Sequence, residues 1–88
     1  MKKRKPSKRK LIFDHTGLKA FALQLKKVRE AEDLTQSQLA FEAKVSLSQI
    51  ARIETARINP TLSTIFSLAR AMRVPLIRLF EFDLPGRK

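Results

Sequence analysis

The sequence predicts an all-α fold of five short helices, and three observations lead to this prediction. Apolar residues recur at three- and four-residue steps in successive segments, which is the spacing of an amphipathic helix. Residues that favour helix starts precede these segments, and Asn-Pro and Val-Pro pairs separate the later ones. No segment alternates apolar and polar residues like a half-buried strand. With 88 residues, the chain has room for one domain and its tails.

The first predicted helix spans residues 17–32, with Thr16 as its N-cap. Lysines lie on its outer faces, and its end at Asp33 is inferred from the start signal that follows. Its apolar stripe consists of Leu18, Phe21, Ala22, Leu25 and Val28.

Two capping boxes define the next two helices, 36–44 and 47–55. In each box a hydroxyl residue is followed three positions later by glutamine, so each can satisfy free backbone donors at a helix start. The boxes pair Thr35 with Gln38 and Ser46 with Gln49. The inward positions are Leu39, Ala40 and Ala43 in one helix, Ile50 and Ile53 in the other, and Val45 in the turn. A connection of about three residues forces a sharp corner between the two helices.

Proline-containing breaks set the last two helices, near 62–73 and near 76–81. Asn59-Pro60 ends a polar loop, Thr61 is the expected cap of the fourth helix, and Val74-Pro75 interrupts the chain again. The apolar stripes consist of Leu62, Ile65, Leu68, Ala69 and Met72, and then of Leu76, Leu79 and Phe80.

The charge of the chain is strongly basic and unevenly distributed. Nineteen lysines and arginines oppose eight acids, a formal net charge of +11. Seven of these cations lie in the first ten residues, which contain no acid. Such a segment cannot bury enough apolar surface to fold alone, so we expect a flexible basic arm over 1–12, a domain over 13–83 and a tail over 84–88. The excess favours a polyanionic partner, and the arm either adds affinity for it or only aids solubility.

Several classes of protein are excluded by what the sequence lacks. There is no cysteine and a single histidine, His15, so neither a disulfide scaffold nor a structural metal site is expected. The acids Glu30, Glu32 and Asp33 are interpreted as a solvated helix end. No apolar run reaches about 20 residues, and none follows the basic N-terminus, so neither a membrane span nor a secretory signal is predicted. No catalytic constellation is present. We expect a cytoplasmic protein that is not an enzyme and that has no cofactor.

Five runs of residues follow one another in order: TQSQLA at 35–40, VSLSQIARIE at 45–54, NPTL at 59–62, LARAMRV at 68–74 and LF at 79–80. Together they resemble the helix-turn-helix family of lambdoid phage repressors and Cro proteins (Cro/C1 type), also called the xenobiotic-response-element family. The resemblance covers residues 18–82 through five helices in order, which makes it specific. It implies a compact repressor-like fold whose second and third helices form the helix-turn-helix.

The resemblance also implies roles in DNA binding. Helix 47–55 matches the recognition helix, whose outward positions would meet base edges in the major groove. The expected base-contacting residues are Leu47, Ser48 and Arg52. The expected backbone-contacting residues are Arg29, Gln36, Lys44, Ser46, Gln49, Thr55, Arg57 and Asn59. Arg29 and Glu54 also match a family ion pair that would join the first and third helices.

Three positions depart from the family pattern. Lys44 stands where glycine usually precedes the turn valine, at a cost of ~1 kcal/mol if the backbone there is left-handed. Ala56 replaces another frequent glycine, which leaves the path of the loop 56–59 open. Pro75 replaces a capping serine or threonine, a minor change because proline is tolerated at a helix start.

The function predicted from these residues is that of a transcription regulator, a repressor or an autoregulator, that binds a palindromic operator as a homodimer and is nucleoid-associated when bound. Apolar side chains near the C-terminus exceed what one short helix can bury, which predicts the dimer surface. Its candidates are Leu76, Ile77, Phe80 and Phe82. The alternative is an antitoxin or bridging module whose C-terminal surface binds a toxin or a polymerase, and a restriction–modification controller is a subtype of the regulator. RNA binding is disfavoured because no aromatic stacking platform is evident.

Overall fold

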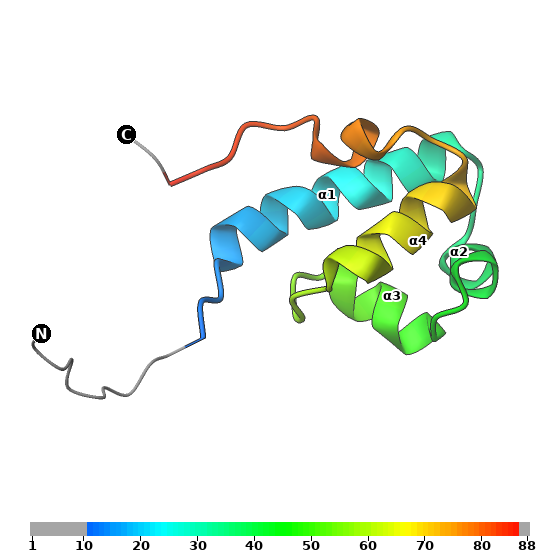
Figure 1. Ribbon diagram of the computed structural model, residues 1–88, viewed down its shortest axis with the longest axis horizontal. Coiled ribbons are helices and arrows are strands. Elements are labelled where there is room, and N and C mark those ends of the chain that lie inside the picture. Colours follow the sequence, from blue (N-terminus) through cyan, green and yellow to red (C-terminus); the bar gives the residue numbers. More distant parts are fainter. Residues whose placement is uncertain (1–10, 87–88) are drawn as a thin grey trace, which may run out of the picture.

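Four α-helices and one 3₁₀ helix make up the computed structural model, which describes residues 11–86 (Figure 1). The elements are α1 (His15–Ala31), α2 (Gln36–Ala43), α3 (Leu47–Glu54), α4 (Leu62–Met72) and the 3₁₀ helix η1 (Leu76–Phe80). The all-α class is confirmed, and no strand occurs within residues 11–86. The count of five α-helices was one too many, because the last element is a single tight 3₁₀ segment. Most of the predicted basic arm lies outside the described residues.

The start of α1 differs from the prediction. Asp14, not Thr16, is the N-cap, and its Oδ1 accepts a hydrogen bond from the backbone N–H of Gly17 at 2.9 Å and another from the Thr16 hydroxyl at 3.0 Å. These bonds hold the pKa of Asp14 below its ordinary value, because they stabilise the ionised carboxylate. Gly17 suits this cap, since a Cβ there would lie 2.7 Å from Asp14 Oδ2 and would displace that carboxylate.

All four α-helices end at or just before a left-handed residue that is not glycine. These residues are Asp33, Lys44, Ala56 and Arg73, with φ of 58–60°. The residue after each donates its N–H to a carbonyl five positions back, which is the long hydrogen bond of a Schellman motif. The four bonds are Leu34 to Arg29, Val45 to Ala40, Arg57 to Arg52 and Val74 to Ala69, at 2.9–3.2 Å. Each helix therefore ends one residue earlier than the sequence pattern predicted.

The core forms where the apolar stripes of all five elements meet. The fully buried large side chains are Leu25, Val28, Leu39, Ile50, Ile53, Leu68, Met72 and Leu79. Three residues assigned to the stripes, Leu62, Leu76 and Phe80, are instead exposed. Leu62 and Leu76 lie in the first turns of α4 and η1, and Phe80 is the last residue of η1. The 3₁₀ helix packs on α1, and the Gln24 side-chain amide donates to the Arg78 carbonyl at 2.7 Å. This bond fixes the C-terminal segment alongside α1 (Figure 1).

Candidate nucleic-acid interface

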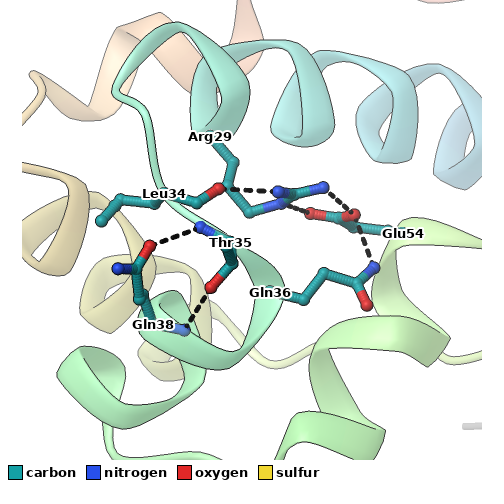
Figure 2. Close-up of polar contacts among 6 residues, drawn as sticks. All are labelled: Arg29, Leu34, Thr35, Gln36, Gln38 and Glu54. Carbon is teal, nitrogen blue, oxygen red and sulfur yellow. Dashed lines mark hydrogen bonds and ion pairs between the residues drawn. The ribbon is translucent and has the colours of Figure 1, made fainter.

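The corner between α2 and α3 is built by its two caps. At Thr35 the capping box is complete, because the hydroxyl accepts from the Gln38 N–H at 3.0 Å and the Gln38 side chain accepts from the Thr35 N–H at 2.8 Å (Figure 2). At Ser46 only the first half is present, a hydrogen bond from the Gln49 N–H at 3.0 Å. The caps fix the starts of both helices, so the second helix leaves the corner in a defined direction.

Lys44 makes the turn between these helices in a left-handed conformation, with φ 60° and ψ 41°. The family's glycine would adopt this conformation without strain, whereas a side chain here costs about 1–2 kcal/mol. The Lys44 side chain is exposed beside the start of α3. A cation is therefore kept at the corner at the expense of backbone strain.

Replacing Lys44 with glycine is expected to raise the free energy of unfolding by about 0.5–1 kcal/mol, the relieved strain less the greater flexibility of glycine. Chemical denaturation followed by circular dichroism measures the change. Lys44→Ala is the matched control, because it removes the same charge and keeps the strain. Equal stability of the two variants would contradict this explanation.

α3 has one buried face and one open face. Ile50 and Ile53 point into the core, while Leu47, Ser48 and Arg52 are exposed on the other side of the helix. The three residues expected to contact bases therefore lie together on one exposed surface. No described segment covers it.

The residues expected to contact the DNA backbone divide into two groups. Five are exposed around the ends of α3: Lys44, Ser46, Thr55, Arg57 and Asn59. Gln36 and Gln49 are half-buried, and Arg29 is buried. The Thr55 hydroxyl donates to the Ala51 carbonyl at 2.8 Å, which satisfies a free carbonyl at the end of α3. The lone pairs of the hydroxyl stay free to accept a further hydrogen bond.

Arg29, Glu54 and Gln36 meet in a buried cluster that joins α1, α2 and α3 (Figure 2). Arg29 Nε and Nη2 donate to the two carboxylate oxygens of Glu54 at 2.6 and 3.0 Å, and Nη1 donates to the Leu34 carbonyl at 2.8 Å. The Arg29 and Glu54 side chains are only 8% and 2% exposed. The Glu54 carboxylate raises the pKa of Arg29 by hydrogen bonding to it, so the guanidinium stays charged.

The sequence did not predict the third member of this cluster. The Gln36 side-chain amide donates to Glu54 Oε1 at 2.9 Å, 18 positions along the chain. Its nitrogen is therefore engaged inside the protein, and its carbonyl oxygen is not among the groups that this cluster uses. Arg29 makes three hydrogen bonds inside the protein, and its side chain is only 8% exposed.

Of the four residues predicted for the dimer surface, three are exposed and one packs inward. Leu76, Ile77 and Phe80 are exposed, whereas Phe82 is half-buried against the core. The Phe80 ring lies 5.5 Å from that of Phe21 and 6.5 Å from that of Phe82. Within residues 11–86, no group of three or more metal-ligating side chains occurs. No helix in that part of the chain is long and apolar enough to cross a bilayer.

The short turn between α2 and α3, the caps at the starts of both helices and the exposed face of α3 define a helix-turn-helix protein. The sequence profile described as "Helix-turn-helix" (HTH_3) matches residues 25–79, and the chain belongs to this family. Its helix-turn-helix is of the Cro/C1 type, as the resemblance predicted. The family is one of DNA-binding regulators rather than a class of enzyme.

Individual relatives agree with this assignment. The chain is 43% identical over 51 residues to the immunity repressor protein of Bacillus phage phi105, a match that covers 58% of this chain and 35% of the repressor. It thus spans about a third of that relative. The crystal structure of the restriction–modification controller protein C.AhdI from Aeromonas hydrophila is 32% identical, with a TM-score of 0.70, over 72% of this chain and 96% of the controller. The controller C.Esp1396I is 25% identical, with a TM-score of 0.68, over 73% and 84%.

Proposed function

We propose that this chain is a sequence-specific regulator, a repressor or autoregulator, that binds a palindromic operator as a homodimer. The observation that supports it is the open face of α3, where Leu47, Ser48 and Arg52 project while Ile50 and Ile53 anchor the helix. An α-helix fits the major groove of B-DNA, where every base pair presents its own pattern of donors and acceptors. Such a regulator acts in the cytoplasm, at the nucleoid.

Each exposed side chain of α3 has a distinct partner in this proposal. The Arg52 guanidinium donates two hydrogen bonds to O6 and N7 of guanine. Ser48 donates to or accepts from a base edge, and Leu47 contacts a thymine methyl group. The exposed polar groups at both ends of α3 bind the flanking phosphates and set the register. The first backbone N–H groups of α2, next to Gln36, face a phosphate at the helix N-terminus.

The homodimer follows from the size of the reading surface. One recognition helix reads about four or five base pairs, and two copies related by a two-fold axis would read half-sites about one helical turn apart. The exposed residues of η1 are the proposed contact between the copies. The test is selection of bound sequences from a random duplex library, which gives the site and its symmetry together. A set of bound sequences with no shared motif would refute the proposal.

Arg52→Ala is expected to lower the discrimination between operator and mismatched DNA about 5- to 150-fold, because a bidentate contact with guanine is worth about 1–3 kcal/mol. Titration of both duplexes at fixed salt concentration measures it. Arg57→Ala is the control: as a phosphate contact, it should weaken binding to both duplexes equally. An unchanged ratio for Arg52→Ala would show that this residue does not read bases.

A second candidate is a protein-interaction role, as an antitoxin or a bridging module. The exposed apolar residues of η1 favour it, Ile77 above all. Purification from the native cell distinguishes the candidates, because a stoichiometric second protein is expected only for this role. The likeness to C.AhdI, which the chain matches over 96% of that controller's length, favours a restriction–modification controller among the regulators.

A further inference from the structure

An apolar groove lies beside the first turns of α1. Its volume is about 270 Å³, and its walls come from α1, the loop before α4, α4 itself and the segment after η1. The apolar side chains in these walls are Leu18, Phe21, Ile65, Phe80, Phe82 and Leu84. An apolar cavity of about 150 Å³ accepts a benzene molecule, so this groove has room for two aliphatic side chains.

Two large aliphatic side chains just before α1 are not among the residues that line the groove. Leu11 is 96% exposed and Ile12 is 87% exposed, whereas the Phe13 ring stacks on His15 with 6.4 Å between ring centroids. Asp14 joins this segment to α1, and its capping hydrogen bonds fix the direction in which the chain leaves the helix. In Figure 1 the segment before α1 runs away from the C-terminal segment that forms one wall of the groove. The segment that carries Leu11 and Ile12 therefore leaves α1 in a direction that does not fill the groove of its own chain, and both side chains are exposed.

We propose that Leu11 and Ile12 of one copy occupy the groove of a second copy, and the reverse, so that a homodimer forms by exchange of its N-terminal segments. This inference rests on the homodimer of the proposed function and names the contact that holds it together. The segment and the groove both adjoin the start of α1. A two-fold axis beside that end of the helix places each segment at the other copy's groove, as a closed symmetric interface requires.

The apolar area available supports the exchange. A stable interface buries about 800 Å² on each partner. A large apolar side chain offers at most about 200 Å² of surface. Scaled by their exposed fractions, the exposed residues of η1 together supply roughly 300 Å². Those residues, Leu76, Ile77 and Phe80, are 40%, 69% and 41% exposed. By the same measure Leu11 and Ile12 add about 350 Å², which more than doubles the apolar area that η1 offers alone.

Cross-linking tests the exchange directly, because the chain contains no cysteine. Ile12→Cys protein and Leu84→Cys protein, one of them lengthened by an affinity tag, are mixed and oxidised with diamide. A disulfide needs Cβ atoms about 3.5–4.5 Å apart, so a mixed dimer reports that residue 12 of one copy lies at the groove of the other. Ile12→Cys mixed with Leu23→Cys is the control, since Leu23 is 66% exposed on α1 and does not line the groove.

The expected result is a mixed disulfide with Leu84→Cys at least tenfold more abundant than with Leu23→Cys. Equal yields would overturn the exchange. So would a double variant, Ile12→Cys with Leu84→Cys, that forms its disulfide only within a single chain, because the segment would then fill its own groove.

Sedimentation equilibrium separates this inference from the proposed function. Ile12→Asp is expected to raise the dimer dissociation constant more than tenfold, while Leu23→Asp leaves it unchanged. If Ile77→Asp dissociates the dimer and Ile12→Asp does not, the exchange is overturned and the homodimer stands. Sequence-specific binding is read independently from the duplex selection, so either proposal can fail alone.

Discussion

Glu54→Ala is expected to lower the free energy of unfolding by about 3–5 kcal/mol, the usual cost of leaving one charge of a buried ion pair without its partner. The Arg29 guanidinium would keep its charge in a site that is almost fully closed to solvent. Gln36 would also lose its acceptor. Small domains have only about 5–15 kcal/mol of stability, so this variant should be partly unfolded at moderate temperature. Urea denaturation followed by circular dichroism measures the loss.

The double variant Arg29→Met/Glu54→Leu is the control. An apolar pair of similar volume removes both charges, and such replacements are often neutral or stabilising. The double variant should therefore be more stable than Glu54→Ala alone. Because the two residues are in contact, the effects of the two substitutions are not expected to add. A loss below 1 kcal/mol for Glu54→Ala would show that the pair is not a main link between α1 and α3.

Removal of residues 1–10 is expected to weaken binding to every duplex by several orders of magnitude at low salt. The segment contains seven of the nineteen cations. Each phosphate that a cation neutralises contributes about 0.9 to the slope of log affinity against log salt, so the slope should fall by up to about 6. These residues lie outside the described part of the chain, and the expectation rests on their charge alone. Titrations at three or more salt concentrations measure the slope.

A full-length variant with the seven cations replaced by glutamine separates charge from length. It should reproduce the shallow slope of the truncated protein, while the ratio between operator and random DNA stays within about threefold of the wild type. If the slope of log affinity against log salt were unchanged, the segment would serve solubility and not DNA binding. Loss of the preference for operator over random DNA would show that the segment 1–10 contacts bases.

The sequence predicted the stripes and the corner well because both depend on local signals. Thr35 and Ser46 act on donors within three residues, and the apolar spacing alone turns Ile50 and Ile53 inward. The exposed set on α3 follows from the same periodicity. These parts of the fold and of the site need no knowledge of distant contacts.

The remaining features depend on contacts or strain that a local pattern does not encode. Thr16 and Asp14 both suit an N-cap, and in the structure the Asp14 carboxylate accepts the Gly17 N–H while the Thr16 hydroxyl donates to the same carboxylate. Gln36 turns toward Glu54 because the fold brings the carboxylate there from 18 positions away. The early helix ends were missed because their left-handed residues have side chains, and sequence reasoning expects glycine at such positions.

The four non-glycine helix ends have a consequence for melting. The only glycines are Gly17 and Gly86, so every residue between them has a Cβ and gives up less backbone freedom on ordering. The entropy gained on melting is therefore small for a chain of this length. The shift in melting temperature equals the lost free energy divided by the unfolding entropy. A small entropy therefore means that a loss of 1 kcal/mol should lower the melting temperature by an amount in the upper part of the usual range of about 4–8 °C. Calorimetry should therefore report small changes in stability of this protein as clearly separated melting temperatures.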